Sequence, residues 1–493
     1  MLRRFTYYLG ILIIAILPLL ISFKLLHLKD PPAWPDEPVF YDMAKNLTTS
    51  NSLEARIYIG TSSDVKNTGL GYPPLYFYTL SYFTDIFGSD IETIRLLSLL
   101  IGISCLIVFF FLVKIIFKNN YLAILGTIIL SLDINFARST RTGRMEISTF
   151  LFMLLSFLFY ILARNKRRNI YLFLAGIASG LAILNHPMGF IAPIIIGANL
   201  IIENFKLKDK LFKIFIFTIP IILALPLWVL KSGSLLDLIS TYGSHLQDKS
   251  PKLPFAFVLF QTDFSWWLLF ITYLIIFIIF LISFFKSKLT KERHLLIFLL
   301  SGFVISTIIL LWGREGGYML YFQPFLILII IFLLNKFYKK SNFVLIIFLT
   351  IFLIINYLNI QFFHNNSFTM TNNKFTSIFE VKNYDYHRFT KSIIETLPKQ
   401  KANIFLSSTP DPYFDLLKLN LYNFYEAPDP SFPLSENEYR KVLDNSDFAI
   451  ITWIPHKLLE EYINNNKEEI ISVGQTNEYQ AMIIKFVSRD KRI

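Results

Sequence analysis

The sequence predicts a polytopic α-helical membrane protein with a separate α/β domain at its C-terminal end. Long apolar segments recur up to about residue 360, and short basic connections separate them. Hydrophobic residues make up 54% of the chain and charged residues only 17%, against about 25% charged in an average soluble domain. Residues 361–493 are more polar than the rest. So much apolar surface exceeds what one soluble core can bury, and lipid is its expected surroundings.

The apolar segments predict about 11 transmembrane helices in a module over residues 1–360. A helix needs roughly 20 residues to cross about 30 Å of hydrocarbon. The first segment is longer than the apolar part of a signal peptide, and no small-residue cleavage site follows it, so we expect a retained anchor. The predicted spans lie near residues 5–26, 95–117, 120–137, 146–163, 170–185, 188–202, 212–230, 266–285, 294–312, 319–335 and 342–360.

The positions of lysine and arginine support this count. If Arg3 and Arg4 are cytoplasmic, every second connection is short and basic, as the positive-inside rule requires. We therefore expect a multi-pass protein of the cell membrane with a cytoplasmic N-terminus. The formal net charge of +12 then reflects topology and not a nucleic-acid partner. These connections contain Lys114 and Lys118; Arg164, Lys166, Arg167 and Arg168; Lys206, Lys208, Lys210 and Lys213; Lys286, Lys288, Lys291 and Arg293; and Lys336, Lys339 and Lys340.

Three regions are predicted outside: the loops 27–94 and 231–265, and the extracytoplasmic domain 361–493. In this domain, helical patterns near 384–397 and 457–465 alternate with strand-like runs, which indicates an α/β fold. The strand-like runs lie at 403–407, 448–453, 470–473 and 481–487. The single cysteine, Cys105, excludes an intrachain disulfide and a cysteine-based metal site.

Two adjacent carboxylates, Asp36 and Glu37, follow a proline-rich approach at the start of the first loop. One of them could act as a general base that deprotonates a hydroxyl group. The alternative is structural, because acidic residues are favoured in the first turn of a helix, and residues 39–47 have the pattern of a short amphipathic helix that could lie on the membrane.

The same loop ends in an aromatic run over residues 71–78 that includes Tyr72. Such a run suits either a platform for a sugar or a belt at the membrane interface. Arg95 begins the second span, where its guanidinium could contact a phosphate or extend to the interface.

The connection 133–146 between the third and fourth spans is predicted as an outer turn that carries three arginines. Arginines on the outer side run against the positive-inside rule. Bidentate guanidinium contacts to a phosphate would explain them. Glu146 stands at the mouth of the fourth span, where a carboxylate is costly and often functional. Arg141, Arg144 and Glu146 are therefore candidate substrate-binding residues. The alternative is an Arg–Glu ion pair that holds the loop.

Two further outer turns complete the candidate site. His186 could bind a phosphate or move a proton, although a lone loop histidine is often incidental. The glycine-containing turn 312–318 carries Arg314 and Tyr318, and Tyr321 follows within the next span.

The order of these residues resembles the protein O-mannosyltransferase and aminoarabinose-transferase superfamily, membrane glycosyltransferases of the C class. The resemblance covers residues 1–200 well and the rest mainly by topology. The family commonly has Asp where Glu146 stands and often Lys near His186. The resemblance is carried by Trp34, Asp36, Glu37, Tyr41 and Ala44, by residues 73–78, by Phe87, Gly88, Arg95 and Leu96, by Ala137 and Arg138, by residues 144–146 and by residues 176–189.

The resemblance implies a GT-C-like fold and transfer of a hexosyl or pentosyl group from a polyprenyl-phosphate donor to a lipid, glycan or protein acceptor. It implies that Asp36 is the base of an inverting transfer, that Glu37 supports it, and that outer Arg and His residues hold the carrier phosphate. No cofactor is required, because arginines can neutralise the phosphate, but a divalent cation could bind between Asp36 and Glu146.

Two other functions remain as alternatives. A transporter or flippase of lipid-linked saccharides would be expected to show internal repeats or charges within its spans, and we find neither pattern in the sequence. A receptor or scaffold would depend on the C-terminal domain alone. The inside connections are too short to form a domain that binds a nucleotide sugar, which favours a donor that arrives from the membrane.

Overall fold

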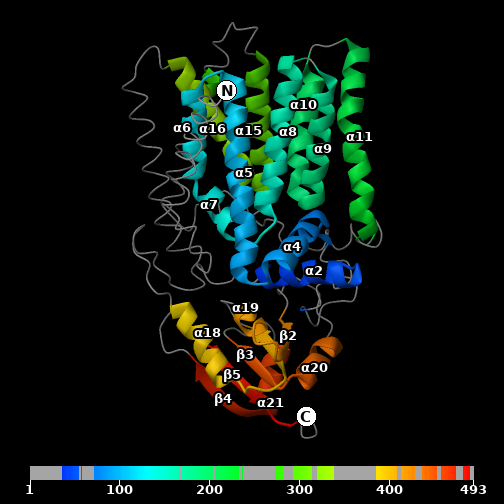
Figure 1. The fold of residues 1–493 in the computed structure, drawn as a ribbon. Helices are drawn as coiled ribbons and strands as arrows, with labels where there is room; N and C mark the ends of the chain where they lie inside the picture. Colours follow the sequence, from blue (N-terminus) through cyan, green and yellow to red (C-terminus); the bar gives the residue numbers. More distant parts are fainter. Residues whose placement is uncertain are drawn as a thin grey trace.

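The computed structural model has two parts, a bundle of helices and a smaller α/β domain at one end of it (Figure 1). We call the end of the bundle near this domain the proximal end and the other the distal end. The predicted spans 5–26 and 342–360 and most of the loop 231–265 lie outside the described residues. The structure describes residues 36–54, 57, 71–166, 168–203, 206–231, 236, 274, 276–282, 293–313, 319–337, 385–407, 412–427, 436–451, 457–473 and 481–488.

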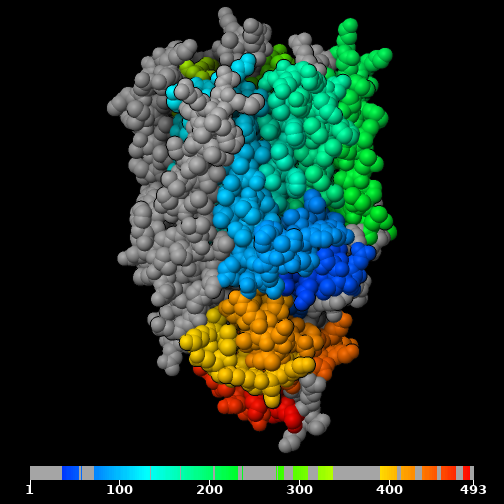
Figure 2. Space-filling model, viewed as in Figure 1, coloured from blue at the N-terminus to red at the C-terminus, as the bar shows by residue number. Residues whose placement is uncertain are grey.

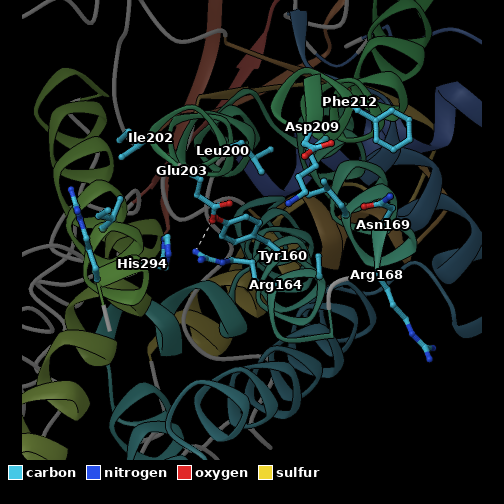
Figure 3. Close-up of a pocket in the computed structure, with 15 residues that line it drawn as sticks. Tyr160, Arg164, Arg168, Asn169, Leu200, Ile202, Glu203, Asp209, Phe212 and His294 are labelled. Carbon is cyan, nitrogen blue, oxygen red and sulfur yellow. Dashed lines mark hydrogen bonds and ion pairs between the residues drawn. The ribbon is translucent and has the colours of Figure 1, made fainter. Parts of the chain in front are cut away.

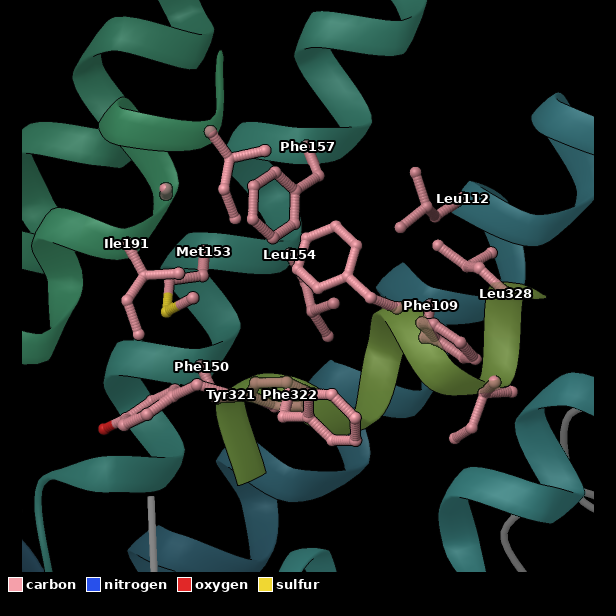
Figure 4. Close-up of a cluster of buried hydrophobic side chains, with 14 of the residues drawn as sticks. Phe109, Leu112, Phe150, Met153, Leu154, Phe157, Ile191, Tyr321, Phe322 and Leu328 are labelled. Carbon is pink, nitrogen blue, oxygen red and sulfur yellow. The ribbon is translucent and has the colours of Figure 1, made fainter. Parts of the chain in front are cut away.

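The helices of the bundle lie side by side and correspond to the apolar segments (Figure 1). Apolar side chains from most of them form one large buried cluster, part of which Figure 4 shows. The helices are α5 (Ile91–Phe117), α6 (Asn120–Ser131), α7 (Ile134–Arg141), α8 (Glu146–Lys166), α9 (Asn169–Asn185), α10 (Ile191–Ile202), α11 (Leu207–Lys231), α15 (Arg293–Gly313) and α16 (Met319–Phe337).

Three of the described helices are long and apolar enough to cross a membrane: Ile91–Phe117, Glu146–Lys166 and Leu207–Leu230. A fourth span results if Asn120–Ser131 and Asn135–Arg141, which are bent by 65°, are counted together. Shorter apolar helices cover Asn169–Asn185, Pro187–Ile202, Arg293–Ile308 and Leu320–Lys336. The bundle is therefore largely helical and apolar, and the number of about 11 spans stays a prediction.

The prediction of a continuous span over 120–137 is wrong, and the connection 133–146 contains a helix where a turn was predicted; its location on the outer side stays a prediction. Helix α6 ends at Ser131, and α7 begins at Ile134. The Asp133 carboxylate causes this break locally, because its Oδ1 accepts a hydrogen bond from the Phe136 amide at 2.9 Å and so caps α7. Two of the three arginines, Arg138 and Arg141, consequently lie in the last turn of α7.

Helices α2 (Asp36–Ser50) and α4 (Leu75–Phe87) lie between the bundle and the α/β domain (Figure 1). Helix α2 begins at Asp36, so both acidic residues stand in its first turn. The predicted short helix over 39–47 is present as part of α2. Its placement on the membrane surface stays a prediction, and protein covers α2 on several sides. Its buried apolar side chains are Val39, Phe40, Tyr41, Met43, Ala44 and Leu47.

The C-terminal domain contains a five-stranded sheet in the order β2-β1-β3-β5-β4. Strands β2, β1 and β3 are parallel, β5 is antiparallel to β3, and β4 is antiparallel to β5. The four predicted strands are present, whereas the pattern missed β2 and two helices, α19 and α20. The elements are α18 (Asp385–Thr396), β1 (Ala402–Ser407), α19 (Tyr413–Leu417), β2 (Tyr422–Glu426), α20 (Glu436–Asn445), β3 (Phe448–Ile451), α21 (Lys457–Asn466), β4 (Lys467–Val473) and β5 (Ala481–Phe486).

The α/β domain packs directly on α2, as the yellow-to-red surface against the blue surface in Figure 2 shows. The Tyr41 ring of α2 contacts the rings of Tyr413 and Phe414 at centroid distances of 6.4 and 5.9 Å. The Lys418 ammonium pairs with the Asp90 carboxylate at 2.9 Å. The domain therefore contacts the layer that carries Asp36 and Glu37.

Close packing of α9 on α11 requires a glycine at position 176. A Cβ atom on Gly176 would lie 2.2 Å from the backbone oxygen of Phe217, whereas a Cβ atom on Gly197 of α10 would meet nothing within 4 Å. We expect Gly176→Ala to lower the free energy of unfolding by roughly 1–3 kcal/mol, because the backbone of α11 must move. Gly197→Ala is the matched control, and it should be neutral or stabilising by about 0.5–1 kcal/mol. Thermal unfolding in detergent compares the two variants, and equal unfolding temperatures would contradict this account.

Candidate functional site

A buried ion pair fixes the first turn of α2. The Arg95 Nε donates to Glu37 Oε1 at 2.9 Å and Nη2 donates to Oε2 at 2.7 Å. Both side chains have no exposed surface. The Gly143 amide also donates to Glu37 Oε1, at 2.7 Å. Glu37 therefore joins α2, α5 and the connection before α8, and protein groups bind both of its oxygens.

Gly143 has to be a glycine for this arrangement. A Cβ atom there would lie 2.2 Å from Ile94 Cγ2 and 3.2 Å from Glu37 Oε1. Ile94 is fully buried and branched at Cβ, so its methyl group cannot rotate away easily. The lack of a side chain at Gly143 thus allows the backbone between α7 and α8 to reach hydrogen-bond distance of the Glu37 carboxylate.

The neighbouring residue, Asp36, belongs to a second and more exposed ion-pair chain. The Arg144 Nη1 lies 2.7 Å from Asp36 Oδ2, and its Nη2 lies 2.7 Å from Glu146 Oε1. The side chains of Asp36, Arg144 and Glu146 are 35%, 18% and 6% exposed. The pairing that the sequence left as an alternative for Glu146 is therefore present. Of the two carboxylates in this chain, Asp36 is the more accessible.

The second oxygen of Glu146 is buried, and the charge of Glu146 acts on Tyr76 of α4. Glu146 Oε2 and the Tyr76 hydroxyl are both buried, and neither has a hydrogen-bond partner among the described residues. Burial, and then the charges of Glu146 and Glu37, raise the pKa of Tyr76 well above its usual value, so its hydroxyl remains a hydrogen-bond donor. The sequence predicted a sugar platform or an interfacial belt for the aromatic run 71–78. Nothing in that pattern distinguished Tyr76 from the other tyrosines.

His186 is buried at the end of α9, with only 3% of its surface exposed. Its Nδ1 accepts a hydrogen bond from the Met188 amide at 3.1 Å and so caps the short 3-10 helix Pro187–Phe190. In the neutral ring this contact leaves the proton on Nε2. The neighbouring Asn185 donates to the Met145 carbonyl at 2.9 Å and to Thr149 Oγ1 at 2.7 Å, which holds this turn against the start of α8.

Tyr72 connects His186 to the rest of the site. Its ring stacks on the His186 ring at a centroid distance of 6.2 Å and an angle of 29°. Phe40 of α2 contacts both Tyr72 and Tyr76, at 5.7 and 6.3 Å. The Trp228 indole of α11 donates to the Gly71 carbonyl at 3.1 Å and holds the preceding turn.

The structure thus brings most of the predicted residues together, and it leaves some elsewhere. Ion pairs and ring contacts connect Asp36, Glu37, Arg95, Arg144, Glu146, Tyr72 and His186. Arg141 is buried at the end of α7. Tyr321 lies among the apolar side chains of the bundle (Figure 4). Arg314 and Tyr318 lie outside the described residues.

The hypothesis of a divalent cation between Asp36 and Glu146 meets a physical obstacle. The Arg144 guanidinium contacts both carboxylates, so it holds the position between them that a cation would need. Among the described residues no group of three His, Cys, Asp or Glu side chains has a geometry for a metal ion. In the described part of the chain, the Arg144 guanidinium therefore holds the two carboxylates together.

Comparison with known families supports the resemblance. Residues 72–230 match the model of the family described as dolichyl-phosphate-mannose-protein mannosyltransferase. The matched segment contains Tyr72, Arg95, Arg144, Glu146 and His186. An uncharacterized protein of Aquifex aeolicus is 28% identical over 160 residues, which are 32% of this chain and 31% of the Aquifex protein. This alignment therefore spans about a third of that relative.

Solved structures share the fold over nearly the whole chain. The crystal structure of ArnT from Cupriavidus metallidurans bound to undecaprenyl phosphate has a TM-score of 0.59 at 11% identity, and the match covers 98% of this chain and 99% of ArnT. The oligosaccharyltransferase of Archaeoglobus fulgidus in its apo form has a TM-score of 0.53 at 13% identity, with 96% of this chain and 74% of that protein covered. The chain has the GT-C fold, and the predicted fold resemblance is confirmed.

The buried pair provides a test of this geometry. We expect Arg95→Met to lower the free energy of unfolding by about 3–5 kcal/mol, because it leaves the Glu37 carboxylate buried without its counter-charge. Lys418→Met is the matched control, since it breaks a pair whose side chains are each 44% exposed, and it should cost less than about 1 kcal/mol. Chemical unfolding in detergent measures both. Equal stabilities would show that the Glu37–Arg95 pair does not hold α2.

Proposed function

We propose that the protein is a glycosyltransferase that transfers a sugar from a polyprenyl-phosphate carrier to an acceptor hydroxyl. The observation that carries this proposal is the chain Asp36–Arg144–Glu146, in which the most exposed carboxylate is held by a guanidinium at 2.7 Å. The family match over residues 72–230 and the shared GT-C fold support a glycosyltransferase. The ArnT structure contains undecaprenyl phosphate, which supports a donor of this type.

Asp36 acts as the general base in this proposal. A guanidinium beside a carboxylate favours its charged form, which is the form that can accept a proton. The acceptor hydroxyl loses its proton to Asp36, and its oxygen forms a bond to the anomeric carbon. The bond between that carbon and the carrier phosphate oxygen breaks, and the electron pair leaves with the phosphate. A single displacement of this kind inverts the configuration at the anomeric carbon.

Glu37 has a positioning role in this scheme. Its oxygens are bound by Arg95 and the Gly143 amide, and its side chain is fully buried. Glu37 thus sets the direction of the first turn of α2, from which Asp36 projects.

Cationic and polar groups next to Asp36 receive the departing phosphate. The Arg144 guanidinium lies next to Asp36 and carries a delocalised positive charge that suits contact with a phosphate. His186, whose ring stacks on Tyr72, is the second group of this cluster that would contact the phosphate. Fixed donors that face developing negative charge lower the barrier without reorganisation. The site faces the outside of the cell membrane in this proposal, on the side of the α/β domain, and the acceptor is a lipid, a glycan or a protein.

Replacement of Asp36 tests the base. We expect Asp36→Asn to lower the transfer rate by about 10²–10⁴-fold, because the amide cannot accept the proton, with little change in unfolding temperature. Membranes are incubated with a panel of radiolabelled polyprenyl-phosphate sugars, and the labelled product is identified. Asp85→Asn, at an exposed position of α4, is the matched control with unchanged rate. Activity of Asp36→Asn within a few-fold of wild type would remove Asp36 from this role, and carrier translocation without sugar release would favour a transporter.

Arg144 is tested by chemical rescue. We expect Arg144→Ala to lower the transfer rate by about 10²–10³-fold, the cost of removing one fixed donor. Guanidinium ions at millimolar concentration should restore part of this loss, because they can re-enter the gap between Asp36 and Glu146. A purely structural arginine would give no rescue. Potassium chloride at the same ionic strength is the control for salt effects.

A further inference from the structure

A cavity of about 910 Å³ lies at the distal end of the bundle, away from Asp36. Helix α8 begins at Glu146 in the candidate site, and its other end carries Tyr160 and Arg164 in the cavity wall. The ends of α9, α10, α11 and α15 complete this wall, as Figure 3 shows. The proposed transfer reaction uses none of these residues.

The charges of this cavity are arranged around one neutralised carboxylate. Arg164 Nη1 lies 2.7 Å from Glu203 Oε1, and the Tyr160 hydroxyl donates to the same oxygen at 3.2 Å (Figure 3). The Glu203 side chain is only 4% exposed, so Arg164 compensates a charge that is already buried. We call this neutral Arg164–Glu203 pair the floor of the cavity, and the other charged residues that line it the rim. The net charge of the cavity is therefore set by the rim.

The rim has a positive surplus. Arg168, Lys213 and Arg293 line the cavity against a single further carboxylate, Asp209. Helices α9, α11 and α15 begin at this end, at Asn169, Leu207 and Arg293, so their positive dipole ends also face this region. The His294 Nδ1 atom is buried and has no hydrogen-bond partner among the described residues. An anion would therefore be stabilised here by side-chain charge and by helix termini together.

One side of the cavity is apolar, and it continues onto the surface of the bundle. Leu172, Leu200, Ile202, Phe212 and Ile297 line it. Ile202 and Phe212 are 51% and 54% exposed, so the apolar wall opens toward the surroundings of the helices. In a membrane those surroundings are lipid chains. A ligand with an anionic head and an apolar tail fits both halves.

We propose that this cavity binds the phosphate head group of an anionic lipid, with the apolar part of the lipid along Ile202 and Phe212. Lys213, Arg293 and the α11 and α15 N-termini recognise the phosphate, and His294 Nδ1 offers a further polar contact. The volume lies within the range of roughly 300–1,000 Å³ that is usual for ligand sites. Basic pockets between membrane helices are a common way to bind such head groups.

A binding experiment on the purified full-length protein in detergent tests the site. Dissociation constants are measured by native mass spectrometry for phosphatidylglycerol and for zwitterionic phosphatidylcholine of the same acyl chains, and for soluble glycerol 3-phosphate. The test variant is Lys213→Gln with Arg293→Gln, which keeps the Arg164–Glu203 floor. The matched control is Lys118→Gln, an exposed cation at the distal end of α5 that does not line the cavity.

We expect wild type and Lys118→Gln to prefer phosphatidylglycerol, and the double variant to bind it roughly thirtyfold more weakly, at about fivefold for each charge removed. Unfolding temperatures without added lipid should agree among the three proteins, which shows that the double variant folds. Glycerol 3-phosphate bound as tightly as the lipid would support the phosphate contacts and assign them to a soluble ester. Equal binding of both lipids, or an unchanged double variant, would overturn the proposal. Transfer activity is not a readout, so failure here leaves the Asp36 mechanism untouched.

Discussion

The buried ion pair between Glu37 and Arg95 is the interaction on which the proximal end of the protein depends. Both side chains are fully buried, so each charge is stable only because the other is present and because the Gly143 amide satisfies a further lone pair. The pair fixes α2 to α5 and to the connection before α8. Asp36, one residue earlier, therefore has a defined position although its own side chain is partly exposed.

Helix α2, which this ion pair fixes, packs against other elements on two sides. Toward the bundle, Phe40 contacts Tyr72 and Tyr76, and Tyr72 stacks on His186. Toward the α/β domain, Tyr41 contacts Tyr413 and Phe414. One helix thus relates the candidate catalytic carboxylate to the membrane module and to the domain. A group that binds an acceptor on the domain would have a rigid connection to Asp36, because both surfaces of α2 are packed.

The two ends of the bundle use arginine in different ways. At the proximal end Arg144 joins two carboxylates, and in the proposed mechanism Asp36 accepts the proton while the Arg144 guanidinium contacts the phosphate. At the distal end Arg164 neutralises Glu203, and the remaining lysine and arginine side chains leave a positive surplus. In both places a guanidinium satisfies a carboxylate that is buried or partly buried, and the charge that remains decides which chemistry the site favours.

Local properties of the sequence determined much of the fold. Apolar length predicted the helices of the bundle, and alternating patterns predicted four of the five strands, because both depend on residues close along the chain. The sequence also predicted a possible pair of Arg144 and Glu146, because the two residues lie close together in one segment. The partner of Glu37 did not, since Arg95 is 58 residues away and Gly143 is 106 residues away. The break at Asp133, the burial of His186 and the distal cavity, which the ends of five helices enclose, also came only from the tertiary structure. Pairing and enclosure depend on distances in space, which the spacing of residues along a chain does not specify.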